Sequence, residues 1–108
     1  MVSGVNEKDW KLFRDRVSEW QEAYMEKLIE EYKALLGGNE QASEKFWALE
    51  KRINQDRQNP GVLLHDVSRS NMDMHLLRLL QYAVIRQEDL KDFSEELRER
   101  IAWFMENV

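Results

Sequence analysis

An apolar stripe with helical spacing runs through the first third of the chain. Its seven members recur at intervals of three, four and seven positions: Trp10, Phe13, Val17, Trp20, Tyr24, Leu28 and Leu35. This spacing places all seven side chains on one face of an α-helix. Asn6 precedes the stripe as an N-cap, and the Gly37-Gly38-Asn39 turn ends it. The sequence therefore predicts a helix over residues 7–36, about 45 Å long.

A second helix is predicted over residues 40–58, ending before Asn59-Pro60-Gly61. Its inward-facing residues are expected to be Ala42, Phe46, Leu49 and Ile53. Because the glycine turn is short, the first two helices should be antiparallel neighbours.

Two more helices complete the chain, after an irregular connection over 60–70. One is predicted over 71–83, opened by a capping box of Ser70 and Asp73, with Met74, Leu77 and Leu80 on its inner face. The other is predicted over 87–106 and aligns Leu90, Phe93, Leu97, Ile101 and Phe104. Threonine is absent and no window alternates apolar and polar residues for long, which disfavours strands. The predicted fold is all-α: one domain over 1–108, an irregular four-helix bundle built on a long antiparallel hairpin plus a second helix pair.

Composition narrows the possible functions. The 108 residues include no cysteine, which excludes disulfides, cysteine zinc sites and thiol catalysis. The net charge of −5 disfavours direct binding to nucleic acid. No apolar run approaches the roughly 20 residues of a membrane span, and residues 1–6 do not resemble a secretory signal. We therefore expect a cytoplasmic protein that does not bind membranes.

Catalytic groups are sparse. His65 and His75, with Asp66 and Arg69 nearby, are the residues on which an enzymatic hypothesis would depend. No His-x-x-x-His pair, serine elbow or glycine-rich phosphate loop accompanies them. We therefore predict a protein that is not an enzyme and uses no metal or cofactor. Arg69 could hold an anion near a helix start, but tying the connection to the bundle is the favoured role.

Acidic residues gather on two outward faces. On the first helix they form a ridge opposite the apolar stripe, and we call these five residues the acidic ridge: Asp15, Glu19, Glu22, Glu26 and Glu30. On the last helix a similar set shares one side: Glu88, Asp92, Glu95, Glu99 and Glu106. The faces either keep the protein soluble or dock a partner with a basic surface.

Two tryptophans lie off the apolar stripes. Trp47 lies beside Ser43, Glu44 and Glu50, and Trp103 lies beside Glu96, Glu99 and Glu106. An aromatic side chain surrounded by carboxylates is typical of a binding hot spot, although burial at the flank of a broad core is the alternative.

Some apolar surface is expected to lack cover within one chain. From residue 25 the first helix gains a second apolar row of Met25, Ile29, Tyr32 and Leu36. The run 101–105 is apolar on nearly every side. Either other helices of the same chain or a second copy, in a homodimer, would have to cover these residues.

Several segments together resemble a family of short, uncharacterised bacterial proteins that are often labelled "multidrug transporter". They are Lys8-Asp9-Trp10 with Phe13, Trp20-Gln21-Glu22 with Tyr24-Met25, Lys45-Phe46-Trp47 with Leu49-Glu50, Pro60-Gly61-Val62, Ser68-Arg69-Ser70-Asn71-Met72, and Asp89-Leu90 with Phe93-Ser94. The resemblance covers nearly the whole chain and brings no established active residues. A chain without a spanning segment cannot itself be a transporter, so we discard the label.

The residues thus favour a protein-interaction module, an acidic adaptor or inhibitor. Its most specific version is an anti-defence inhibitor, such as an anti-CRISPR protein, whose carboxylates occupy the basic nucleic-acid channel of an enzyme. The candidate binding residues are Asp15, Glu19, Glu22, Glu26, Glu30, Trp47, Arg69, Glu95, Glu99 and Trp103. A structural or regulatory homodimer is the alternative, and an enzyme using His65 and His75 is a third hypothesis.

Overall fold

The computed structural model describes residues 6–107. It contains four α-helices: α1 (Glu7–Leu36), α2 (Ala42–Asp56), α3 (Met72–Gln81) and α4 (Glu95–Asn107). Two short 3-10 helices, η1 (Arg69–Asn71) and η2 (Gln87–Leu90), precede α3 and α4. These described residues contain no strand, so the prediction of an all-α fold is confirmed.

Both ends of α1 are fixed by local hydrogen bonds. The Asn6 side chain accepts from the backbone N–H groups of Lys8, at 2.8 Å, and Asp9, at 3.3 Å. Gly37 follows the last turn, and its N–H donates to the Lys33 carbonyl at 2.9 Å. The helix therefore has the bounds that its caps predict.

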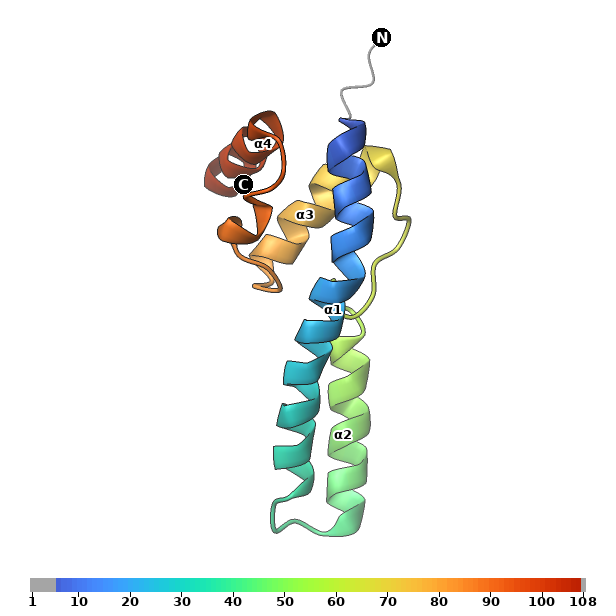
Figure 1. The fold of residues 1–108 in the computed structure, drawn as a ribbon. Helices are drawn as coiled ribbons and strands as arrows, with labels where there is room; N and C mark the ends of the chain where they lie inside the picture. Colours follow the sequence, from blue (N-terminus) through green and yellow to red (C-terminus); the bar gives the residue numbers. More distant parts are fainter. Residues whose placement is uncertain (1–5, 108) are drawn as a thin grey trace.

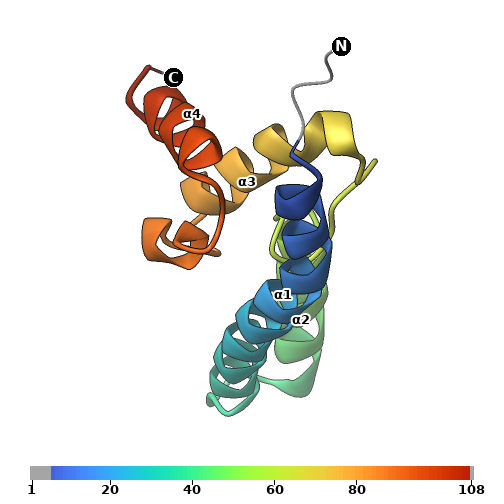
Figure 2. The ribbon, with the colours of Figure 1, turned by 45° about the horizontal axis from the view of Figure 1, so that its top comes forward.

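The four helices do not form a uniform bundle. The amino-terminal half of α1 lies beside α3 and α4, whereas its carboxyl-terminal half pairs only with α2 in a projecting arm (Figures 1 and 2). The described chain measures 60 × 24 × 23 Å, and its radius of gyration is 17.0 Å. A compact domain of this length would have a radius of gyration of about 13 Å. The molecule is thus a small globular end with a two-helix arm.

The hydrophobic core lies entirely at the globular end. It is built from α1, α3 and the apolar residues between Ile85 and Ile101. Its members are Trp10, Phe13, Met72, Leu76, Leu79, Leu80, Ile85, Leu90, Phe93, Leu97 and Ile101. No residue of α2 is buried. In the arm, Leu28 is the buried apolar residue of α1.

The prediction that Ala42, Phe46, Leu49 and Ile53 of α2 face inward is wrong, because none of them is buried. Phe46 is 64% exposed and Ile53 is 40% exposed, while Leu49 is half-buried. The reason is that α1 covers one side of α2, while α3 and α4 pack at the opposite end of α1 (Figure 1).

The predicted start and inner face of α3 also need correction. The buried residues are Met72, His75, Leu76, Leu79 and Leu80, while Met74 is 51% exposed. Ser70 and Asp73 form no capping box, because Asp73 instead accepts hydrogen bonds from Arg100 of α4 at 2.8 and 3.3 Å. The Asp73 carboxylate thus forms a long-range ion pair with Arg100 in place of the local hydrogen bonds of a capping box.

The last helix begins later than predicted, at Glu95 rather than near Gln87. Residues 87–90 form η2, where the Asp89 carboxylate accepts from the Arg86 N–H at 2.8 Å. Ser94 caps α4, since its Oγ accepts from the Leu97 N–H at 3.2 Å. The buried Asp9 carboxylate accepts from the N–H of Ser94, at 2.8 Å, and from its hydroxyl, at 2.6 Å. This contact joins the first turns of α1 and α4.

Candidate partner-binding site

An apolar groove lies between α3 and the end of α4. Its volume is about 400 Å³, and it is lined by Ser70, Asp73, Met74, Leu77 and Phe104. Met74 is exposed because it lies on the outer side of α3, away from the buried Leu76 and Leu79. We call this hollow the α3–α4 groove.

Trp103 lies beside the groove and is 58% exposed. Its ring packs edge-on against Phe104, with centroids 5.3 Å apart. The last buried residue of α4 is Ile101, and in the final turns of the helix Met105 packs against the core while Trp103 and Phe104 stay exposed. The two rings thus hold each other in position while both remain exposed to solvent.

The charges along α4 are mainly negative. Arg100 is paired with Asp73, and hydrogen bonding to this carboxylate raises the pKa of the guanidinium above its ordinary value. Glu96, Glu99 and Glu106 are exposed, and none forms an ion pair with another described residue. A partner therefore meets an aromatic pair beside free carboxylates.

The acidic ridge is exposed along its whole length on α1. Lys33 donates to Glu30 at 3.1 Å, which offsets part of the repulsion at the carboxyl-terminal end of the ridge. The other four carboxylates form no ion pair within the described chain.

The acidic set on the last helix is divided. Arg16 of α1 binds Asp92 at 2.9 Å, and this hydrogen bond lowers the pKa of the Asp92 carboxyl. Asp92 therefore ties α1 to the segment before α4. Glu88 lies in η2, and Glu95 and Glu99 remain exposed on α4.

Neither Arg69 nor Trp47 lines the α3–α4 groove. Arg69 forms two hydrogen bonds with Glu7, at 2.8 and 3.0 Å, and its guanidinium lies 5.6 Å from the centre of the Trp10 ring. It ties the connection to α1, which is the role that the sequence favoured over anion binding. Trp47 lies on the arm, 63% exposed, with its ring packed edge-on against Phe46 at 4.9 Å.

The predicted candidate residues thus lie in four places rather than one: the acidic ridge, the end of α4, the arm and the Glu7–Arg69 contact. The groove residues Met74 and Leu77 were missed as binding residues, because the sequence places them on the inner face of α3. The apolar run 101–105 was the signal that marked this end of α4.

The histidine cluster is engaged in structural contacts. His75 is buried, and its Nε2 lies 3.2 Å from the carbonyl oxygen of Asp66. The Asp66 carboxylate accepts from Asn71 at 2.8 Å, while His65 is exposed. These contacts involve His75 and Asp66 but not His65, and the buried Nδ1 of His75 has no hydrogen-bond partner among the described residues. Residues 6–107 contain no group of three or more His, Cys, Asp or Glu side chains placed to hold a metal ion.

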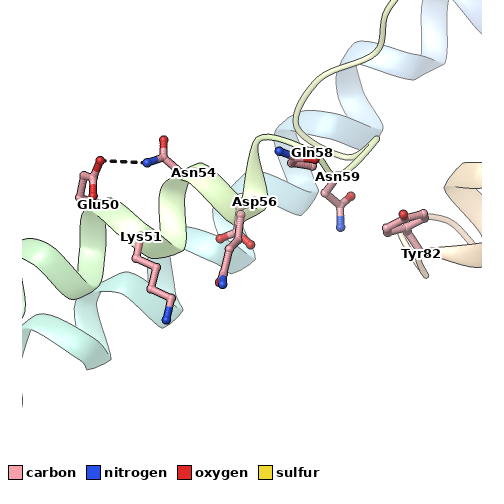
Figure 3. Close-up of a pocket in the computed structure, with 8 residues that line it drawn as sticks. Glu50, Lys51, Asn54, Asp56, Gln58, Asn59 and Tyr82 are labelled. Atoms are coloured by element: carbon pink, nitrogen blue, oxygen red, sulfur yellow. Dashed lines mark hydrogen bonds between the residues drawn. The ribbon is translucent and has the colours of Figure 1, made fainter.

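A second hollow lies along the carboxyl-terminal half of α2 and faces Tyr82 (Figure 3). Its lining is polar: Glu50, Lys51, Asn54, Gln55, Asp56, Gln58 and Asn59. Asn54 donates to Glu50 at 2.9 Å. The labelled residues come from α2, from the turn that follows it (Gln58 and Asn59) and, for Tyr82, from the residue after α3 (Figure 3). Apart from the Tyr82 ring, this surface offers a partner no large apolar side chain.

Within the part of the chain that the structure describes, no helix is both long and apolar enough to cross a membrane. Comparisons with protein-family models, with curated proteins and with solved structures find no match to this chain. The resemblance to the bacterial family therefore stays a prediction, and function has to be argued from the surfaces described above.

Proposed function

We propose that this protein is a non-enzymatic, cytoplasmic interaction module that binds a partner protein with a basic surface. The observation that carries the proposal is the exposed Trp103–Phe104 pair, which borders an apolar groove and lies beside free carboxylates. Tryptophan anchors that enter a partner's pocket supply much of the affinity of protein interfaces. Carboxylates around them speed association with a basic partner and exclude acidic ones.

The acidic ridge extends this proposal to its most specific form. Its carboxylates span about 22 Å of α1, a length over which a basic nucleic-acid channel presents several cationic side chains. An inhibitor of a nucleic-acid enzyme, of the anti-CRISPR type, would use such a row of negative charge in place of phosphates.

The test starts with affinity capture from the native host, using the full chain as bait. Binding of the captured partner is then measured with purified proteins at low and high salt. We expect affinity to fall as salt rises and to fall with charge reversal at Glu22, Glu26 and Glu30, since screening weakens exposed charge pairs. Trp103→Ala should weaken binding by roughly tenfold or more, as expected for a hot-spot residue.

Trp47→Ala is the matched control, because Trp47 is an equally exposed tryptophan on the arm. It should leave partner binding unchanged. Binding that is equally strong at all salt concentrations, or that survives the charge reversal, contradicts the proposal.

A further inference from the structure

The arm carries a second exposed apolar surface that the proposed function does not use. Its members are Ile29 and Leu36 of α1 with Phe46 and Ile53 of α2, and Trp47 extends it at the outer edge. Ile29 is 50% exposed and Leu36 is 42% exposed, and the α2 residues are exposed to a similar or greater extent. We call these five residues the hairpin face.

Helical geometry places the hairpin face on one side of the arm. The register of the hairpin is set by Gln21–Pro60, Tyr24–Asn59 and Glu31–Arg52 contacts. The same register puts Leu36 opposite Phe46, and Ile29 opposite Ile53. At about 100° per residue, Ile29 and Leu36 lie on the same side of the α1–α2 seam that Phe46 and Ile53 occupy on α2.

The globular end does not cover this face. Phe13 and Trp20, which pack against the core, lie on the other side of the seam when α1 is followed at about 100° per residue. The helices α3 and α4 gather at the amino-terminal half of α1, away from the arm (Figures 1 and 2). A second chain could therefore approach the hairpin face along its whole length.

We propose that the hairpin face binds the same face of a second copy, so that two arms form a four-helix bundle. A twofold axis parallel to the arm places each α1 opposite α2 of the other copy, with every neighbouring pair antiparallel and both Gly37–Gln41 turns at one end. Phe46 then packs near Leu36 of the second copy, and Ile29 near its Ile53.

The charges at the rim of the face are complementary in this arrangement. Lys33 and Glu50 lie at one level of the hairpin, on the outer edges of α1 and α2, and Glu26 and Arg57 lie at another. Opposing α1 with α2 of the second copy brings each of these charges beside its opposite. Opposing the two α1 helices instead would set the acidic ridges side by side, where like charges repel.

The area of the face also fits a dimer. The five apolar side chains expose on the order of 500 Å² together, judged from the area that side chains of these sizes bury. A stable interface covers roughly 800 Å² per partner, of which the apolar centre is the larger part. The charged rim supplies the remainder.

Sedimentation equilibrium of the full chain at micromolar concentration tests the proposal. We expect a dimer whose dissociation constant rises roughly tenfold or more with Phe46→Asp, because this exposed aromatic side chain packs against Leu36 of the second copy. Met74→Asp is the matched control on the α3–α4 groove and should leave the dimer intact. Helix content, followed by circular dichroism, should be unchanged in both variants because the substituted side chains are exposed.

The arrangement of the two arms is tested separately. Lys33→Glu should weaken the dimer several-fold, and adding Glu50→Lys should restore it. Since the chain has no cysteine, Asn39→Cys places a single thiol in the turn, where a short bismaleimide should link two copies.

Three results would overturn the proposal: a monomer at all accessible concentrations, a dimer that is lost with Met74→Asp but not with Phe46→Asp, and a dimer that does not crosslink through residue 39. Trp103→Ala, which tests the proposed partner site, should not change self-association, so the two proposals can fail independently.

Discussion

Ala83 adopts a backbone conformation that side chains disfavour. Its φ is +59°, immediately after α3, and its N–H donates to the Leu80 carbonyl at 3.0 Å. The Val84 N–H donates to the Leu79 carbonyl at 2.9 Å, which completes a left-handed helix stop. Glycine is the residue that usually ends a helix in this way, because it has no Cβ to clash with the backbone.

Ala83→Gly should therefore stabilise the protein by about 1 kcal/mol, since it removes the left-handed strain of a Cβ. The measurement is the free energy of unfolding in urea. Ala23→Gly, at an exposed position inside α1, is the control and should cost about 1 kcal/mol. If both glycines destabilise equally, Ala83 is not strained in solution.

The ionisation of Tyr32 is displaced to high pH. Burial raises its pKa to about 12, and hydrogen bonding to the Asp56 carboxylate adds to the effect. The folded state thus favours the neutral phenol. The stability that results is complete below pH 10, the ordinary pKa, and is lost as pH rises through about 12.

Ultraviolet absorbance of tyrosinate should therefore show a late ionisation step at a pH near 12. Tyr32→Phe should remove this late step. A late step that persists in Tyr32→Phe would assign it to another tyrosine.

At the level of elements, a hydrogen-bonded pair joins the first turns of α1 and α4, beside the core that the two helices share. Asp9 lies in the first turn of α1, but its carboxylate accepts two hydrogen bonds from Ser94, which caps α4. A helix pattern indicates which residues can cap it, whereas the partner of a buried carboxylate depends on how distant helices pack. The sequence therefore placed α1 correctly and started α4 too early.

Ser94→Ala should destabilise the fold by about 2–3 kcal/mol, because it removes the cap of α4 and one partner of a buried carboxylate. The double variant with Asp9→Ala should cost less than the sum of the two single changes, since the pair acts as a unit. Both are measured by urea unfolding.

Ser70→Ala is the control. Ser70 was predicted as a cap, but among residues 6–107 its hydroxyl forms a hydrogen bond with Ser68 alone, at 3.3 Å. The substitution should change stability by less than about 0.5 kcal/mol. A loss of 1 kcal/mol or more at Ser70 would restore the predicted capping box.

At the scale of the whole molecule, the amphipathic pattern revealed which faces are apolar but not which faces are covered. The second apolar row of α1, from Met25 to Leu36, signalled that the arm needs cover on two sides. The structure places α3 and α4 at the other end, so Ile29 and Leu36 remain exposed. Which helices meet depends on the path of the 57–71 connection, which periodicity does not describe.

This uneven burial predicts uneven stability within one chain. The helix α3 has five buried residues and α2 has none, so α2 should open with a lower free energy than α3. Amide hydrogen exchange followed by mass spectrometry should show fast exchange in peptides from 42–56 and slow exchange in peptides from 72–81.

Because a second copy would cover the hairpin face, exchange in 42–56 should slow as protein concentration rises, whereas exchange in 72–81 should not. In Phe46→Asp the concentration dependence should vanish while the difference between the two segments remains. Equal protection of both segments at low concentration would show that α2 is stabilised by contacts within the single chain, and the arm would then need no second copy to be ordered.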